Sequence, residues 1–122
     1  MKSFLPVCFF LFVQIISSAS ENWPRFRGNN GDGRADFTIP PVWEKSDYRW
    51  SLDLDEEGHG SPSVWKNRVF LNTATDKGKT REVICVNANT GKIEWLRSYP
   101  STNHNTHRFN SYASSTPAVD AD

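Results

Sequence analysis

The fold is decided by one stretch of sequence, Cys85-Val86-Asn87-Ala88-Asn89-Thr90-Gly91-Lys92-Ile93-Glu94-Trp95. Its first residues continue a β-branched, apolar run that starts at Glu82, which is typical of a strand inside a sheet. The segment from Ala88 to Gly91 has the composition of a tight turn, and Gly91 supplies the conformational freedom that ends it. A second strand is expected from Lys92 to Ser98. The stretch therefore predicts an antiparallel hairpin.

Short strands separated by polar turns are also expected upstream of this hairpin. The alternation in Tyr48–Leu54 predicts a strand with Trp50, Leu52 and Leu54 on one face. No amphipathic helix is expected after residue 20, so the chain is predicted to be all-β, with hairpins about 8–12 residues apart. The four strands of the central unit are expected near residues 62–65, 68–74, 82–87 and 92–98.

The sequence also contains a partial internal repeat. Trp50 followed by Pro62 recurs as Trp95 followed by Pro117, with steps of 45 and 55 residues. The additional ten residues lie in the second loop, before Pro117. A unit of four short strands that repeats at roughly 40–50 residues is typical of a propeller blade.

The deciding stretch resembles the repeat of the pyrroloquinoline-quinone (PQQ)-like β-propellers, which runs Ala-x-Asp-x-x-Thr-Gly-x-x-x-Trp. Thr90, Gly91 and Trp95 match this pattern, while Cys85 stands at the Ala position and Asn87 at the Asp position. The segments around Pro62 and Pro117 resemble the first strand of the family's blades. The run Trp23-Pro24-Arg25-Phe26-Arg27-Gly28, with Asn30-Gly31-Asp32-Gly33 after it, resembles the opening of bacterial secreted members.

This resemblance implies a partial β-propeller in an N-terminal fragment of a longer protein, because propellers need about 4–8 blades to close. It implies one complete four-stranded antiparallel blade, an N-terminal closing strand and the first strand of the next blade. It also implies that the Trp of one blade stacks beside the Gly of its neighbour. The expected parts are a signal peptide (1–20), an irregular N-terminal arm (21–46), a closing strand with its loop (47–60), the blade (61–99), an inter-blade loop (100–114) and the start of a second blade (115–122).

Residues 1–20 have the layout of a secretory signal peptide. Lys2 precedes an apolar run from Phe4 to Ile16, and small residues follow from Ser17 to Ser20. The run is shorter than the roughly 20 residues that a spanning helix needs, which leaves an uncleaved membrane anchor as the alternative. We therefore expect export to the periplasm, cell envelope or extracellular space, and no membrane span after cleavage.

The composition excludes some partners. Fourteen basic residues balance 14 acidic residues, which argues against a nucleic-acid binder and against a polybasic membrane-surface patch. After residue 20 only about 31% of the residues are apolar, below the roughly 45–50% of ordinary domains. All five tryptophans lie in this part. The core is therefore expected to rely on a few large aromatic side chains.

Three histidines are the candidate ligands for a metal. His104 and His107 lie in the inter-blade loop and His59 in the preceding polar loop, and three histidines with a water form a catalytic zinc set. A solvated or structural loop is the alternative that we favour, so no metal site is predicted. The segment from Asn29 to Asp36 is similar to a calcium loop but fails the EF-hand spacing, which favours a hydrogen-bonded turn.

Three further side chains have both a structural and a chemical interpretation. Cys85 is expected to lie inside a strand and to pack as a small apolar residue. Trp23 and Trp43 could serve as platforms for sugars or quinones, but anchoring of the core is the favoured role.

Two functions follow from the resemblance. The first is a non-catalytic PQQ-like propeller of the bacterial envelope that acts as an interaction scaffold or binding ring. Its expected partners are other envelope proteins or the remaining blades. The alternative is a quinoprotein alcohol or sugar dehydrogenase that uses PQQ and calcium. No carboxylate base or metal cluster of such an enzyme is identifiable in the sequence, and no other cofactor is evident, so the scaffold is favoured.

Overall fold

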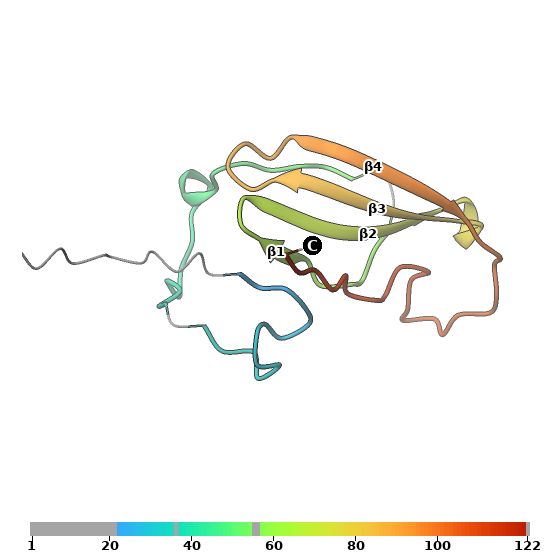
Figure 1. The fold of residues 1–122 in the computed structure, drawn as a ribbon, viewed down its shortest axis with the longest axis horizontal. Coiled ribbons are helices and arrows are strands. Elements are labelled where there is room, and N and C mark those ends of the chain that lie inside the picture. The colour runs from blue at the N-terminus through green and yellow to red at the C-terminus, as the bar shows by residue number, and fades with distance from the viewer. Residues whose placement is uncertain (1–21, 36, 55–56, 122) are drawn as a thin grey trace, which may run out of the picture.

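The fold is that of an all-β chain built around one antiparallel sheet. The computed structural model describes residues 22–35, 37–54 and 57–121, so the predicted signal peptide lies outside the described residues. Four strands form a meander in the order β1-β2-β3-β4 (Figure 1). Their bounds are Ser63–Trp65 for β1, Arg68–Thr75 for β2, Thr80–Asn87 for β3 and Ile93–Pro100 for β4. Two short 3-10 helices complete the elements, η1 (Lys45–Asp47) and η2 (Asp76–Gly78).

The predicted antiparallel strands are confirmed, with small differences at their ends. The β2–β3 ladder continues to the pair Thr75 and Thr80, where η2 closes the hairpin. The expected strands ended at residue 74 and began again at residue 82, but cross-strand pairing extends both of them toward the turn. Pro62 immediately precedes β1. This position suits proline because it has no N–H group to donate to a strand ladder.

The centre of the core is β3, which is buried on both faces. Ile84, Cys85 and Val86 are successive residues that are at most 3% exposed. Directly paired residues share a face, so Cys85 lies on the same face as Phe70 and Trp95. A register shift between Cys85 and Val86 inserts one additional residue into β4. Such a bulge bends the strand and re-aims the side chains beside it.

Two predicted strands are absent from the structure. Residues 48–54 and 115–119 form no strand, because neither segment has a neighbouring ladder to pair with in the described part of the chain. Trp50, Leu52 and Leu54 are nevertheless half-buried, while Ser51 and Asp53 between them are exposed. The alternation therefore predicted the buried face correctly and the strand incorrectly.

The segment after β4 returns to the sheet. In Figure 1 the orange-to-red chain leaves the end of β4 and runs back to the side of β1. The Asn72 Nδ2 group donates to the Ser115 carbonyl at 3.2 Å, and the hydroxyl of the fully buried Ser63 donates to the Pro117 carbonyl. Residues 111–117 therefore cover part of the sheet.

The N-terminal arm is irregular, as predicted, and is anchored beside β1. Trp23 and Val64 exchange two backbone hydrogen bonds of 2.8 Å, which add an isolated bridge to the free edge of β1. The Val119 N–H donates to the Pro24 carbonyl at 2.9 Å. Both ends of the described chain therefore meet at this edge. No helix in the described ranges is long and apolar enough to cross a membrane.

Candidate functional site

The turn between β3 and β4 is organised by Asn87. Its Oδ1 atom accepts hydrogen bonds from the backbone N–H groups of Asn89 at 3.0 Å and Thr90 at 3.1 Å. Gly91 ends the turn in the left-handed region with a φ of 71°, and its N–H donates to the Asn87 carbonyl at 2.9 Å. Asparagine thus provides the acceptor oxygen that a carboxylate would provide at the same position.

Trp50 packs directly on this turn. A Cβ atom added to Gly91 would lie 2.6 Å from the Trp50 ring, so only glycine allows this approach. The Trp50 Nε1–H group donates to the Ala88 carbonyl at 2.7 Å, which satisfies the polar end of the indole. The Arg49 guanidinium donates to the Asn89 side chain at 3.3 Å. A tryptophan from an upstream segment is therefore held on the glycine turn of the sheet.

The bulge in β4 brings a polar cluster together beside the buried thiol. The Glu94 carboxylate accepts from Arg68 Nε at 2.8 Å and from Asn87 Nδ2 at 3.0 Å. These two donors hold the pKa of Glu94 below its ordinary value, and the same ion pair raises the pKa of Arg68. Burial, followed by the nearby Glu94 charge, raises the pKa of Cys85. Burial and Glu94 outweigh the opposite effect of the Arg68 charge, so the thiol form of Cys85 is favoured inside the sheet.

Trp95 lies on the same face as Cys85 and remains half-buried. Its ring is 6.0 Å from the Phe70 ring at an interplanar angle of 55°, and the Arg97 guanidinium lies 5.2 Å from its centre. In the described part of the chain, the closest aromatic contacts on glycine come from Trp23, Trp50 and Tyr112. Trp95 therefore packs within its own sheet.

The three histidines do not come together. No group of three or more possible metal ligands occurs among the described residues, which include all three histidines. The His104 ring packs edge-on against Tyr112 at 5.5 Å, and His107 Nδ1 accepts from the Phe109 N–H at 3.4 Å. The His59 N–H donates to the Ala113 carbonyl at 3.1 Å. The structure therefore does not bring these three histidines together as a zinc site would require, and the contact of His59 is made by its backbone rather than by its ring.

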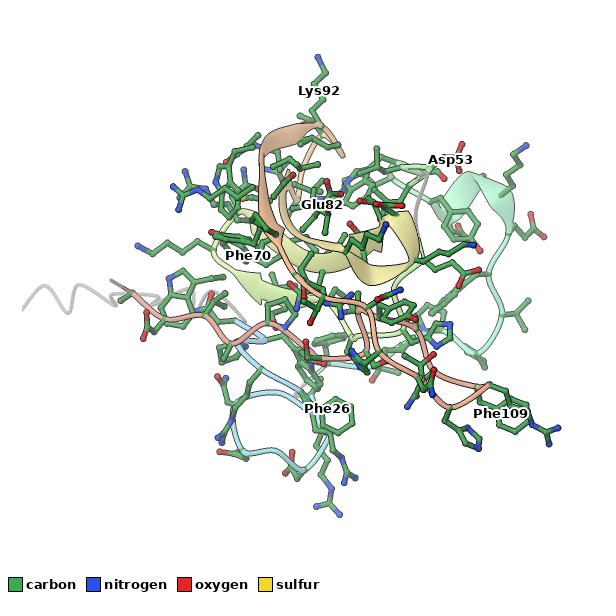
Figure 2. All side chains as sticks on the ribbon, turned by 90° about the vertical axis from the view of Figure 1, so that its right-hand side faces the viewer. Phe26, Asp53, Phe70, Glu82, Lys92 and Phe109 are labelled. Atoms are coloured by element: carbon green, nitrogen blue, oxygen red, sulfur yellow. The ribbon has the colours of Figure 1, made fainter. Side chains whose placement is uncertain are left out.

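An anchor of the loop after β4 was not identified from sequence. Tyr112 lies on Gly78 so closely that an added Cβ atom would be 2.3 Å from its ring. The Tyr112 hydroxyl donates to the His104 carbonyl at 2.8 Å, and the Arg81 guanidinium lies 5.1 Å from the ring centre. At the far end of the loop Phe109 is 68% exposed and points away from the sheet (Figure 2). One aromatic side chain thus fastens an otherwise projecting loop.

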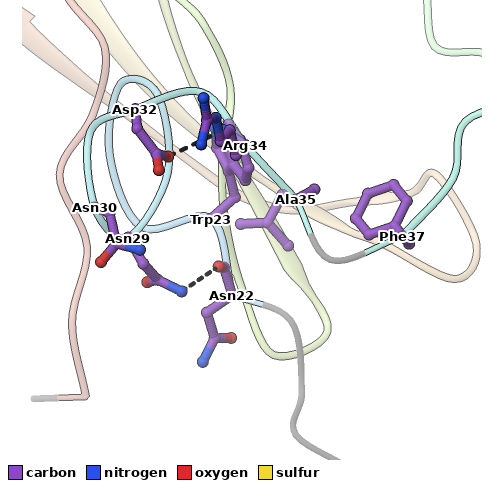
Figure 3. Close-up of a pocket in the computed structure, with 9 residues that line it drawn as sticks. Asn22, Trp23, Asn29, Asn30, Asp32, Arg34, Ala35 and Phe37 are labelled. Carbon is purple, nitrogen blue, oxygen red and sulfur yellow. Dashed lines mark hydrogen bonds between the residues drawn. The ribbon is translucent and has the colours of Figure 1, made fainter.

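A cleft of about 570 Å³ opens in the N-terminal arm (Figure 3). Its lining combines the aromatic side chains Trp23 and Phe37 with amide, carboxylate and guanidinium groups from Asn29, Asn30, Asp32 and Arg34. The Asp32 side chain accepts the Arg34 N–H at 3.0 Å, so the predicted hydrogen-bonded turn is present. Anchoring of the core was the favoured role for Trp23 and an aromatic platform the alternative; the structure places Trp23 in the lining of the cleft, which depends on contacts that local sequence does not contain. Trp43 is 56% exposed and does not line it.

Comparison of the chain with known protein families, with curated proteins and with solved structures gave no match. The assignment of function therefore rests on the geometry described above.

Proposed function

We propose that this chain belongs to a non-catalytic PQQ-like β-propeller of the bacterial cell envelope, in which the four-stranded sheet is one blade. The ring acts as a scaffold that binds other envelope proteins. The observation that carries this proposal is the contact of Trp50 with Gly91. It joins a segment that precedes the sheet to a turn inside the sheet, as a contact between neighbouring blades requires.

The spacing of the tryptophans extends this contact into a repeat. Trp95 lies in β4, the last strand of the sheet, and Trp50 lies 45 residues earlier, in the segment before the sheet. If Trp50 docks one unit on the next, then Trp95 is placed to dock the sheet on a further unit. A large flat side chain suits this role because stacked sheets have few other means of fixing their relative position. The layout of residues 1–20 supports export as part of this proposal.

Imaging of the protein, purified at its natural length, tests the architecture. Electron micrographs are expected to contain ring-shaped particles with about 4–8 radial blades. Particles without a central channel or radial symmetry would overturn the propeller. N-terminal sequencing is expected to begin after residue 20, and a start at Met1 would contradict the export signal.

A dye-linked assay tests the absence of catalysis. The protein is incubated with PQQ and calcium and then supplied with primary alcohols or aldoses. No turnover above a PQQ-only control is expected. Robust reduction of the dye would replace the scaffold with an oxidoreductase while leaving the ring intact, so the two parts of the proposal can fail separately.

A further inference from the structure

We propose that the cleft in the N-terminal arm binds a neutral saccharide. This site goes beyond the scaffold function and does not depend on the ring, because its walls come from the arm and from β1 alone. A volume of about 570 Å³ lies within the roughly 300–1,000 Å³ range of small-ligand sites. It is large enough for an oligosaccharide end of a few sugar units.

The chemical groups in the cleft match the two kinds of surface that a pyranose presents. Phe37 is 53% exposed, so its ring is available to the C–H face of a sugar. Trp23 provides a second aromatic surface, held in place by its contact with Gly28. Sugar hydroxyls both donate and accept, and side-chain amides offer both functions from one planar group. Asn29 and Asn30 supply such amides.

The charge of the lining favours an uncharged ligand. The cleft contains one carboxylate, from Asp32, and one guanidinium, from Arg34. Opposite charges of equal number give no net attraction for an anion or a cation, while both groups pair well with hydroxyls. In the described part of the chain, no hydrogen bond or ion pair occupies the Asn30 amide or the Arg34 guanidinium. These groups are free to meet a ligand.

The walls of the cleft are held before any ligand arrives. The Gly33 N–H donates to the Arg27 carbonyl at 2.9 Å, and Arg25 donates to the carbonyls of Gly28 and Asn29. The Asn29 amide donates to the Asn22 carbonyl at 3.2 Å (Figure 3). In Figure 3 Asn29, Asn30 and Asp32 lie on one side of the cleft and Phe37 on the other. Such preorganisation lowers the entropy that binding would cost.

Saturation-transfer difference NMR on the protein at its natural length tests the site. The probes are maltotriose, cellotriose and N,N′,N″-triacetylchitotriose as neutral ligands, with trigalacturonate as the anionic comparison. At least one neutral trisaccharide is expected to receive saturation. Phe37→Ala and Asn30→Ala are each expected to weaken its affinity by roughly tenfold, as loss of a central contact does.

Matched variants separate the cleft from general effects of truncation. Phe109→Ala removes a phenylalanine of similar exposure, and Asn105→Ala removes another exposed asparagine; both lie in the distant loop after β4. Both controls are expected to bind like the unmodified protein. The proposal is overturned if no neutral trisaccharide binds, if trigalacturonate binds more tightly, or if the cleft variants and the control variants bind equally well. Near-UV circular dichroism establishes that each variant keeps its packing.

Discussion

Two separate constraints require glycine at position 91, and their energetic costs can be measured separately. Its φ of 71° places it in the left-handed region, and the Trp50 ring occupies the space where a side chain would begin. Gly31 is subject only to the backbone constraint, because its φ is 70° and no atom lies within 4 Å of an added Cβ. The pair therefore distinguishes backbone strain from the tryptophan contact.

Gly91→Ala is expected to destabilise the protein more than Gly31→Ala. Left-handed backbone costs an alanine about 1–2 kcal/mol, and overpacking against Trp50 adds about 1–3 kcal/mol at Gly91 only. In a Trp50→Ala background, Gly91→Ala is expected to cost no more than Gly31→Ala does. Urea unfolding of the natural-length protein measures the two single variants at Gly91 and Trp50 and their double variant as a double-mutant cycle, with Gly31→Ala as the control for backbone strain. Equal costs with and without Trp50 would show that the two residues are not energetically coupled.

The thiol of Cys85 is expected to react slowly because of its surroundings. It is fully buried in β3, and burial together with the adjacent Glu94 raises its pKa. At mildly alkaline pH the folded protein is expected to react with a thiol reagent on the order of a hundredfold more slowly than the unfolded protein, because reaction requires local opening. Peptide mass spectrometry locates the label. A Cys85→Ala/Ser101→Cys variant is the control, since Ser101 is exposed and is expected to react quickly. Rapid labelling of native Cys85 would contradict its burial.

At the scale of elements, the sequence predicted correctly the structure that is determined by residues close together in the chain. The β3–β4 hairpin was predictable because its turn residues and its apolar strands are adjacent in the chain. The bulge at Glu94 was not, because it becomes defined only when β4 pairs with β3. The cleft was missed for the same reason, since it needs Trp23 to pair with Val64. Contacts between distant segments thus account for the parts of the site that sequence did not predict.

The loop after β4 offers a prediction at this scale. Tyr112→Ala is expected to release the loop, because it removes the stack on Gly78 and the hydrogen bond to the His104 carbonyl. Limited trypsin digestion at Arg108 should then become faster by about tenfold or more, as cleavage follows local opening. Tyr48→Ala is the matched control, because Tyr48 is 62% exposed and should leave the rate unchanged. An unchanged rate in Tyr112→Ala would mean that other contacts hold the loop.

At the scale of the whole molecule, the apolar surface exceeds what one sheet can bury. Ile93, Leu96 and Tyr99 on β4 are each 46–48% exposed, and Ile39, Val42 and Trp43 in the arm are each more than half exposed. The buried apolar core of the described residues comprises Ala74, Ile84, Cys85, Val86 and Ala113. Such exposure is typical of surfaces that meet another unit. The low apolar content had predicted a core that relies on a few large aromatic side chains, and this prediction was wrong. None of the buried apolar residues in the described part of the chain is aromatic, and Trp23, Trp50 and Trp95 are only half-buried.

Residues 21–122 expressed alone are therefore expected to unfold without a cooperative transition. Five small buried side chains supply too little hydrophobic free energy to offset the conformational entropy of about a hundred residues. Differential scanning calorimetry should give a broad, shallow trace for this segment. A sharp peak is expected for the natural-length protein if the proposed ring supplies further units that cover β4. Near-native strand content by circular dichroism without a calorimetric peak would agree with this expectation. A sharp melt of the isolated monomer would contradict it and would show that the sheet, the arm and the loop are sufficient for a stable domain.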